Sequence, residues 1–535
     1  MSTFDLPNTR PDAAPDFTDA SACAKWLQSL PLINVGTSHE RLLGQLEELN
    51  ACAIAPAERL KILELLREPV SFVQVEHSKK FSSRPAPLAK PEREFLHSAH
   101  ALWDALSSGY QHCLQAIAGG GPGKNAALIA QRVLWCTGQK MIAYYQAYQH
   151  VGEHEWKLLH GVYALAEERG AAGDEVPHPV RKGKDTTCTE TYAQILLLDL
   201  AYPGKLTLRQ IELISNWIEY WARKVSVVRT AATAGDSVAP LIVDLAGVAG
   251  ASRRLAEGDN TRVLEIQELG GSLRKRIGRL RKGETPAALG LGEDVTAQLA
   301  DSLLVMLYRR WCEDKQSRAH PRRGTSGTAQ ICTGMAAMHF FVTGRSFQMR
   351  GGPRKISQVQ HDEIATFGRL ATRHEDAPAT TTTFPVETWQ IKDESASGLR
   401  LERIDPAAAS RLVLGQLLGI RPADAKAFLL CAIRWLSVSS EFGLCIGVQI
   451  LPGIPLGVAI RAPDAGAAAA AEQYTQALML PAIAALQTPE TLVLPVGWFK
   501  ADREIEVFNE RAGQVRLLSV VDRGADFERV IFEIA

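Results

Sequence analysis

The spacing of apolar residues divides the chain into a helical part and a strand-rich part. From His39 to about Glu313, apolar residues recur at intervals of three and four, and leucines at positions 42, 43, 46 and 49 give the first instance. This spacing places apolar side chains on one face of a helix. We therefore predict helices over residues 39–50, 56–66, 92–117, 126–169, 190–200, 208–225, 240–257, 260–280 and 294–313.

The pattern changes after about residue 325. Threonine, valine, isoleucine and phenylalanine become common in short runs separated by glycine and proline, which is typical of antiparallel strands. Within Ala467–Leu486 the pattern returns to that of a helix. The predicted strands lie in residues 328–342, 387–392, 398–404, 428–438 and 443–451, and four more lie in residues 491–534. The fold class is therefore α+β and multidomain, with an all-helical N-terminal half.

Composition narrows the class of protein. The 59 lysines and arginines balance 59 aspartates and glutamates, so the net charge is zero. This argues against a protein whose entire surface binds nucleic acid or anionic lipid. The nine cysteines include no C-x-x-C pair, so a disulfide framework or a zinc module is not indicated. The sequence shows neither a signal peptide nor an apolar run long enough to span a membrane. We expect a cytoplasmic protein with no cofactor and no membrane insertion.

Three motifs favour ordinary structural interpretations. The segment Ala118–Asn125 resembles a phosphate-binding loop, but its first and last residues do not fit that pattern, and a helix precedes it. We interpret it as a turn between helices. Arg274–Lys282 carries six cations in nine residues near a helix end, where cations are favourable, and it could also face a partner.

The third motif is His150, Glu153 and His154, which fit the H-x-x-E-H pattern of some zinc peptidases. On one continuous helix, the two histidines would lie one turn apart as zinc ligands, and Glu153 would activate the zinc-bound water. No third ligand is indicated, and the same residues suit the wet side of an amphipathic helix. A zinc hydrolase stays open as an alternative.

Two further motifs fit one chemistry. Arg318 and Arg322 form an R-x-x-x-R spacing, followed by Arg323, in a segment that Pro321 keeps from being helical. An extended arginine arm can bind phosphate oxygens and stack on flat bases. Arginine-rich linkers are also common without any ligand.

The second motif is Asp393-x-Ser395-x-x-Gly398, between two predicted strands. Such residues suit a hairpin turn, where glycine can take a positive φ. The functional interpretation is that the carboxylate of Asp393 accepts from the N1–H and N2–H donors of a guanine. Ser395 would then donate a hydrogen bond to a phosphate or a base.

Together these motifs resemble the PilZ domain, a bacterial receptor module for cyclic di-GMP. Later segments continue the resemblance, namely Gly398–Leu401, Leu414–Gly419, Ile433–Trp435 and Ile446–Gln449, and it covers about residues 315–452. The resemblance implies a six-stranded antiparallel β-barrel, with Arg318, Arg322, Arg323, Asp393, Ser395 and Gly398 as ligand residues. Here the two motifs are separated by an insertion, in which we predict a helix over Gln358–Thr372.

With this resemblance, the predicted domain organisation has four parts. They are a flexible tail (1–37) with a short helix near residues 24–30, an all-helical domain (38–313), a PilZ-like barrel with an insertion at about 351–383 (314–455), and a C-terminal α/β extension of one helix and strands (456–535).

The predicted function is that of a receptor for cyclic di-GMP and not of an enzyme. Ligand binding would reorient the helical half toward a protein partner, with no specific nucleic acid involved. The alternatives are a PilZ-like module that binds proteins and no nucleotide, and the zinc hydrolase.

Overall fold

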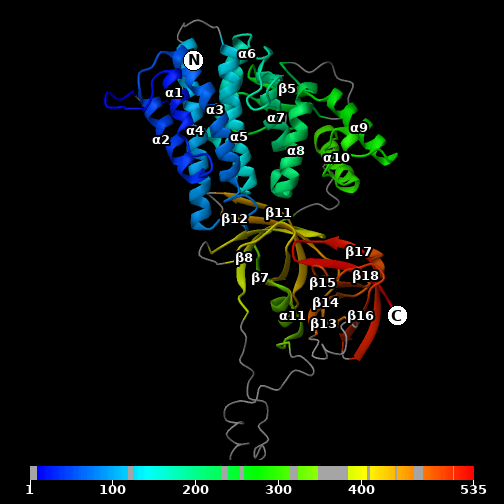
Figure 1. The fold of residues 1–535 in the computed structure, drawn as a ribbon. Helices are drawn as coiled ribbons and strands as arrows, with labels where there is room; N and C mark the ends of the chain where they lie inside the picture. The colour runs from blue at the N-terminus through cyan, green and yellow to red at the C-terminus, as the bar shows by residue number, and fades with distance from the viewer. Residues whose placement is uncertain are drawn as a thin grey trace, which may run out of the picture. The chain divides into compact units, whose positions relative to one another are not determined.

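The computed structural model forms two compact units, Met1–Arg318 and Ala319–Ala535 (Figure 1). Each unit is described by itself. The structure describes residue 6 and residues 9–118, 125–229, 239–253, 258–313, 323–347, 384–405, 410–439, 443–462, 474–509 and 511–535. None of the helices within these ranges combines the length and the apolar character that crossing a membrane requires.

The first unit is mainly helical, as predicted. Its helices are α1 (Ala20–Gln28), α2 (Val35–Ala51), α3 (Pro56–Ser78), α4 (Lys90–Ala118), α5 (Ala126–Gln146), α6 (Glu153–Glu168), α7 (Cys188–Leu200), α8 (Leu208–Trp221), α9 (Gln267–Arg281) and α10 (Ala297–Cys312), with 3₁₀ turns at Pro203–Lys205, Ala222–Lys224 and Ala287–Leu289.

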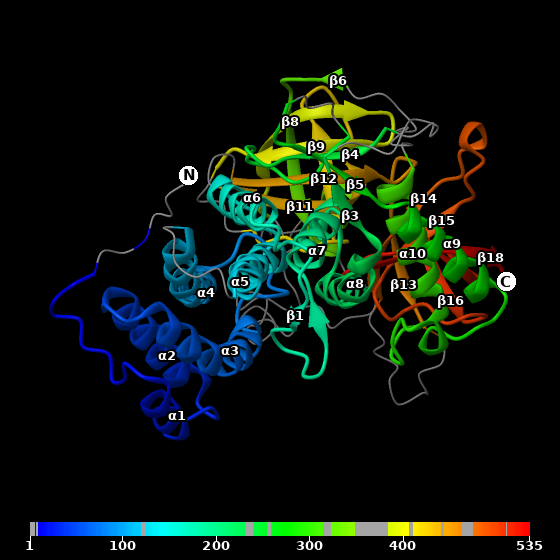
Figure 2. The ribbon, with the colours of Figure 1, turned by 90° about the horizontal axis from the view of Figure 1, so that it is seen from above.

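Local sequence signals set the starts of these helices. Pro56 opens α3 at its first position, where the missing N–H costs nothing. Thr207 and Gln210 form a capping box at the start of α8. The helices pack around α5, which contacts α4, α6 and α7 and is buried on most of its sides (Figure 2).

The first unit also contains strands where helices were predicted. β4 (Leu241–Asp244) and β5 (Thr261–Glu265) pair with β3 (Ser226–Val228) in the order β3-β5-β4. The predicted helix over 240–257 is therefore wrong, because its described residues, 240–253, contain a strand and turns and no helix, and the helix predicted over 260–280 begins only at Gln267. Periodicity alone does not distinguish a short apolar strand from a buried turn of helix. A second small sheet pairs β1 (Val176–Pro177) with β2 (Asp185–Thr186).

The N-terminal segment is more ordered than the predicted flexible tail. The helix α1 begins at Ala20, four residues before the predicted short helix, because the side chain of Asp19 caps it by accepting from the Ala22 N–H. Phe17 and Cys23 are fully buried in the helical core. This segment therefore belongs to the first unit and packs on it.

The second unit begins with a closed barrel of six antiparallel strands. The strands follow the order β8-β7-β10-β11-β12-β9, and the pairing of β9 with β8 closes the ring. A short strand, β6 (Arg323–Gly324), adds to the free edge of β8 near its end. The six strands are β7 (Thr328–Thr333), β8 (Glu387–Ser395), β9 (Gly398–Arg403), β10 (Leu417–Pro422), β11 (Leu429–Ser439) and β12 (Gly443–Ile450).

The strand predicted over 328–342 is confirmed over its first six residues and wrong over the rest. β7 ends at Thr333, and residues Met335–Thr343 form the helix α11 after Gly334. The insertion at about 351–383 and the helix predicted in it, Gln358–Thr372, lie outside the described residues.

A second closed barrel follows, with the strand order β13-β14-β15-β18-β17-β16. Its last four strands match the four predicted within residues 491–534. The helix predicted over Ala467–Leu486 is contradicted over Thr475–Leu480, which is a strand, while residues 463–473 lie outside the described ranges. The strands are β13 (Leu456–Arg461), β14 (Thr475–Leu480), β15 (Thr491–Pro495), β16 (Glu504–Asn509), β17 (Arg511–Arg523) and β18 (Phe527–Ile534), with a 3₁₀ turn at Ala484–Leu486.

The two barrels share a core and several polar contacts. Leu417 of the first barrel and Phe527 of the second lie in one apolar cluster with α11. The carboxylate of Asp526 accepts from the Leu417 N–H at 2.8 Å, and Arg434 pairs with Asp522 at 2.5 Å. Burial raises the pKa of Asp526. The second unit is thus built from two barrels that pack directly on each other.

Candidate ligand-binding site

The β8–β9 hairpin holds the Asp-x-Ser-x-x-Gly motif. β8 ends at Ser395, β9 begins at Gly398, and the two residues between them form the turn. Ser395 pairs with Gly398 across the hairpin, and the Ser395 Oγ donates to the Gly398 carbonyl oxygen at 3.2 Å. This bond uses the one proton of the hydroxyl, which the sequence interpretation assigned to a phosphate or a base, so in this structure Ser395 offers a ligand only the lone pairs of its oxygen.

Gly398 is required by a close approach of two strands. It lies in extended backbone, so the positive φ that the sequence suggested is not the reason for a glycine here. A Cβ at this position would overlap the carbonyl oxygen of Val448 on β12. The glycine lets β9 pair with β12 directly beside the turn, where Gly398 faces Gln449.

The arginine arm ends beside this hairpin. In the antiparallel pairing of β6 with β8, Arg323 faces Glu394 and Gly324 faces Asp393. The Thr325 N–H donates to the Lys392 carbonyl oxygen at 3.4 Å, which continues the contact. Arg323 is exposed. The structure therefore brings one of the three predicted arginines to the hairpin, although 71 positions of sequence separate Arg323 from Glu394, the residue that it faces.

The other two arginines of the arm, Arg318 and Arg322, lie outside the described residues. Only three positions separate Arg322 from Thr325, whose backbone is bonded to β8. Arg318 is four residues farther along the chain.

The outer face of the barrel beside the hairpin carries a cation and an aromatic ring. Cross-strand pairs place Asp393 opposite Arg400, Arg400 opposite Gly447, and Gly447 opposite Trp435, so these residues share one face. A Cβ at Gly447 would overlap the indole of Trp435, which shows that the ring lies across this glycine. Trp435 is partly exposed.

The charges on this face act on each other. The pKa of Arg400 is raised above its usual value first by its hydrogen bond to the sulfur of Cys445 and then by the nearby carboxylates, among them that of Asp393. Glu402 is held by Lys392 at 2.7 Å. A carboxylate, a guanidinium and a flat ring thus lie in one row on the barrel surface. Such a row can contact a planar base on its edge and on its face.

Sequence reasoning did not single out Trp435 or Arg400, which share the outer face with Asp393. The segments around both were noticed only as strands. The signal that could have found them is the pairing register of the strands. The ring of Trp435 can lie across Gly447 only because these two residues face each other on neighbouring strands. That register follows from the barrel and not from the local pattern.

The structure does not support the zinc alternative. The predicted continuous helix over 126–169 is broken, because α5 ends at Gln146 and α6 begins at Glu153. His150 therefore precedes the helix that carries His154, and the two do not share a helix face. Within the described ranges, no group of three or more His, Cys, Asp or Glu residues could hold a metal ion.

The basic cluster Arg274–Lys282 lies on α9, and acidic neighbours neutralise part of it. Arg279 pairs with Glu284, and Arg281 pairs with Asp301 at 2.8 Å. The guanidinium of Arg276 lies over the ring of Trp221, and its burial lowers its pKa. The cluster is therefore a largely satisfied helix face.

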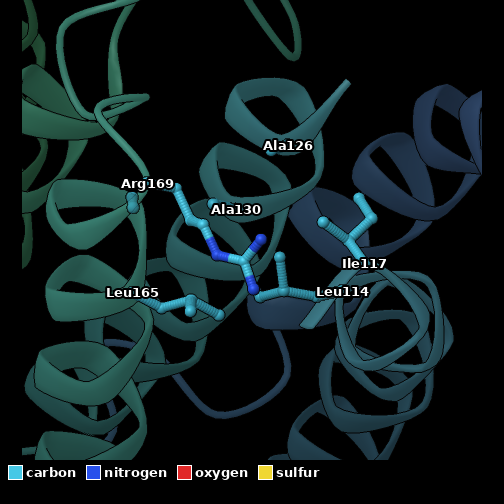
Figure 3. A pocket seen from close by; sticks show the side chains of 7 residues that line it. Leu114, Ile117, Ala126, Ala130, Leu165 and Arg169 are labelled. Carbon is cyan, nitrogen blue, oxygen red and sulfur yellow. The ribbon is translucent and has the colours of Figure 1, made fainter. Parts of the chain in front are cut away.

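Two other features of the first unit are structural. An apolar pocket between α4, α5 and α6 is lined by leucine, isoleucine and alanine side chains, and the Arg169 side chain extends over it (Figure 3). Its free volume is about 10 Å³, the space of about one water molecule, so it does not admit a nucleotide. The turn predicted at Ala118–Asn125 does connect two helices, α4 and α5, and residues 119–124 lie outside the described ranges.

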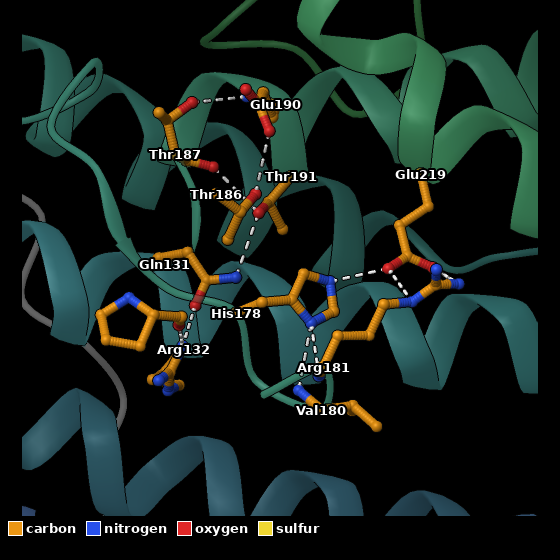
Figure 4. Close-up of polar contacts among 11 residues, drawn as sticks. Gln131, Arg132, His178, Val180, Arg181, Thr186, Thr187, Glu190, Thr191 and Glu219 are labelled. Carbon is orange, nitrogen blue, oxygen red and sulfur yellow. Dashed lines mark hydrogen bonds and ion pairs between the residues drawn. The ribbon is translucent and has the colours of Figure 1, made fainter. Parts of the chain in front are cut away.

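A polar network fixes the hairpin of β1 and β2 to α8 (Figure 4). The Nδ1 of His178 accepts from the backbone N–H groups of Val180 and Arg181, so its Nε2 carries the proton and donates to Glu219 at 2.9 Å. Arg181 binds the same carboxylate at 2.7 Å. Each charged group in this network is satisfied by the others, which indicates a structural role.

The fold and the site together define a class of protein. The chain joins a helical unit to two closed barrels, and the first barrel carries an arginine strand beside an Asp-x-Ser-x-x-Gly hairpin. The chain is thus of the class in which a helical domain and a pair of β-barrels are joined in one polypeptide.

Comparisons with known proteins agree with this class. Residues 21–231 match the domain described as "Cyclic-di-GMP receptor FimW, N-terminal domain", and residues 458–535 match the "FimW C-terminal beta-barrel domain". The chain is 25% identical to the cyclic-di-GMP receptor FimW of Pseudomonas aeruginosa over 533 residues, which covers 90% of this chain and 85% of that protein. The chain is thus similar to the FimW receptor family at both ends.

These findings bear on three of the expectations. The similarity to a receptor supports a binding protein and not an enzyme. The predicted α+β multidomain fold is confirmed, with the second barrel in place of a mixed C-terminal extension. The first barrel has the six strands that the PilZ resemblance implies, but the matched domains carry the name FimW, and the PilZ assignment stays a prediction.

Proposed function

We propose that this protein is a receptor for cyclic di-GMP and binds it on the first barrel, between the arginine arm and the β8–β9 hairpin. The observation that carries the proposal is the pairing of β6 with β8, which sets Arg323 opposite Glu394 and Gly324 opposite Asp393, so that the end of the arm runs along the hairpin. The similarity to a relative named as a cyclic-di-GMP receptor supports the same ligand.

Each part of the site has a role that its chemistry suits. Arg318, Arg322 and Arg323 bind the two phosphates, because guanidinium groups make strong, bidentate hydrogen bonds to phosphate oxygens. Asp393 accepts from the N1–H and N2–H of a guanine, an edge that adenine does not offer. Trp435 offers the outer face of its ring for stacking, since its inner face rests on Gly447.

Calorimetric titration of the full chain with cyclic di-GMP tests this proposal. We expect one saturable binding event that weakens by at least about tenfold in each of the variants Arg318→Ala, Arg322→Ala and Arg323→Ala, because each loses a charged contact of about 1.5–3 kcal/mol. The matched control is Arg516→Ala on the second barrel, which removes a guanidinium that pairs with Glu504 and Glu533. Equal affinities in all five proteins would refute the arm as the phosphate clamp.

We also propose that ligand binding passes to the helical unit through the arm. The division between the two compact units falls at Arg318–Ala319, within the R-x-x-x-R motif. Ordering a segment of backbone costs about 1–2 kcal/mol per residue, so a ligand that engages the arm changes the freedom of the connection between the units. A protein partner that binds the helical unit would read this change.

Limited digestion with trypsin tests this second step, because trypsin cuts after the arginines of the arm. Cyclic di-GMP should slow cleavage between residues 318 and 323 at least about fivefold, since ordered backbone is a poor protease substrate. Cleavage at the arm that proceeds at the same rate with saturating ligand would overturn the role of the arm in transmission. Cyclic di-AMP at the same concentration is the control.

A further inference from the structure

An apolar stripe runs along the outer face of α3 in the helical unit. Leu65, Phe72 and Val75 are 38%, 49% and 60% exposed, and Pro69 lies between them on the same side. Their spacing of seven and three residues keeps them on one face of the helix. Large apolar side chains that line up on a surface indicate an interaction site, whereas single exposed ones do not.

The charges at the two ends of this stripe form a pattern that complements itself. Before the stripe, Lys61 pairs with Glu58 at 2.9 Å, and after it Lys79 pairs with Glu76 at 2.7 Å. Along α3 the order is therefore acid, base, apolar stripe, acid, base. When a second α3 runs antiparallel to the first, each acid at one end meets a base at the other.

The spacing makes this complementarity hold residue by residue. Lys61 precedes Leu65 by four positions, and Glu76 follows Phe72 by four. An antiparallel pair that sets Leu65 against Phe72 of a second copy thus sets Lys61 against the second copy's Glu76. The same register sets Glu58 against Lys79, because each of these lies three positions farther out.

We infer that this stripe is the contact surface of a symmetric homodimer, in which α3 packs antiparallel against α3 of a second copy. The inference does not rest on the proposed nucleotide ligand, since every residue that carries it lies in the helical unit. Leu65 of each copy is covered by Phe72 of the other. At each end of the interface, the ion pair of one helix and the ion pair of the other form a network of four charges.

The centre of the stripe is compatible with such a pair. Pro69 has no N–H to bond the carbonyl of Leu65, so one hydrogen bond of the helix is absent at the centre of the stripe, although α3 continues through it. Glu68 lies near the dimer axis, where two copies would repel each other. In each copy, however, Lys182 pairs with Glu68 at 3.5 Å and compensates its charge.

The dimer should be weak, because one helix pair offers a limited area. α3 is 23 residues long, which corresponds to about 35 Å of helix. A stable interface usually buries about 1,200–2,000 Å² in total, and one pair of helices lies at the low end of that range. We expect a dissociation constant of about 1–100 μM.

Sedimentation of the full chain over a series of concentrations tests the inference. Lys61→Glu should weaken dimerisation at least about tenfold, because it sets two glutamates against each other at both ends of the interface. Adding Glu76→Lys to the same chain should restore dimerisation, although it leaves the intrahelical pairs unfavourable. Phe72→Glu should abolish the dimer.

Two control variants separate the dimer from local stability. Lys157→Glu on α6 breaks an equally exposed helical ion pair, with Glu153, outside the stripe. Ile33→Glu removes a fully exposed apolar side chain in the segment between α1 and α2, outside the stripe. Neither should change the dissociation constant. A chain that stays monomeric at about 100 μM, a dimer that persists in Phe72→Glu, or a Lys61→Glu defect that Glu76→Lys does not repair would overturn the inference.

Disulfide crosslinking tests the register itself. A mixture of Lys61→Cys chains with Glu76→Cys chains should form a crosslinked dimer on oxidation, because positions 61 and 76 face each other. Each variant alone should crosslink no more than the unmodified chain, in which seven of the nine native cysteines are buried. Crosslinking of either variant alone at the rate of the mixture would refute the antiparallel register.

Discussion

The two barrels of the second unit are built alike, but they differ in how their outer charges are used. Both are closed rings of six antiparallel strands. On the second barrel, outer arginines are matched by acids: Arg516 pairs with Glu533 at 3.2 Å, and Arg523 pairs with Glu528 at 2.9 Å. On the first, Arg323 is exposed on an added strand, and Arg400 shares its face with Asp393 and Trp435.

The difference shows that the barrel is a scaffold and that the site is made by a few local changes on it. Those changes are an extra strand that brings an arginine, two glycines that allow close approach, and an aromatic ring left partly open. Function in such a fold depends on the residues placed on it and not on the fold itself.

The largest effect is expected from Gly398→Ala. The new Cβ would overlap the Val448 carbonyl oxygen, so β9 must move away from β12, which costs about 1–3 kcal/mol of the free energy of unfolding. The hairpin that holds Asp393 would move with it and ligand binding would fall below detection. Gly513→Ala on β17 is the control, because nothing lies within 4 Å of its Cβ position. Chemical denaturation and calorimetry measure both effects, and equal effects of the two variants would remove the special role of Gly398.

Asp393→Ala should have the next largest effect, on specificity. We expect affinity for cyclic di-GMP to fall by about tenfold or more, because a matched acid-to-base contact is worth about 1–3 kcal/mol. Any weak binding of cyclic di-AMP should change by less than about twofold, since adenine has no donor pair for this carboxylate. Competition titrations with both dinucleotides make the comparison. If the unmodified protein binds both ligands equally, the guanine-reading role of Asp393 is wrong.

Gly447→Ala should have an intermediate effect. The added Cβ would displace the indole of Trp435 from its resting place, and the stacking surface would be lost while the ring itself stays in the sequence. We expect affinity to fall by about fivefold, within the range of one stacking contact. Tryptophan fluorescence should change on addition of cyclic di-GMP in the unmodified protein and much less in this variant. A fluorescence response of equal size in both would place the ligand away from Trp435.

The smallest effect is expected from Arg434→Ala, which removes the ion pair with Asp522 between the barrels. This pair is partly exposed, so its loss should cost less than about 1 kcal/mol of unfolding free energy. Ligand affinity should be unchanged within a factor of about two. A loss of binding comparable to that of Asp393→Ala would show that the second barrel takes part in the site.

The sequence predicted those elements whose pattern is local. Alternation around Leu399 and Leu401 predicted β9, and leucines spaced by three and four predicted α2. It failed where a strand is short and apolar, as at Leu241–Asp244, and where an alanine run adjoins a strand, as before Thr475. In both cases the choice between helix and strand is made by pairing with a distant segment, which the local pattern does not contain.

The candidate site was predictable only in part, for the same reason. The chemistry of the arginine arm and of Asp393 and Ser395 can be inferred from residue type and spacing. Strand register across the barrel decides that Arg323 lies opposite Glu394 in the hairpin strand and that Trp435 lies over Gly447. For Gly398 the structure gives a different reason for the glycine from the one that the sequence suggested, since steric contact with β12 and not its φ angle requires it. Its role in ligand binding stays a prediction.

Hydrogen exchange of the full chain, with and without cyclic di-GMP, tests the central claim most directly. Because the ligand is expected to lie between the arm and the β8–β9 hairpin, amide protection should rise over residues 318–327 and 393–398 together. The matching hairpin of the second barrel, between β16 and β17, should exchange at the same rate in both states. Protection that rises in the second barrel, or in the hairpin without the arm, would contradict the account.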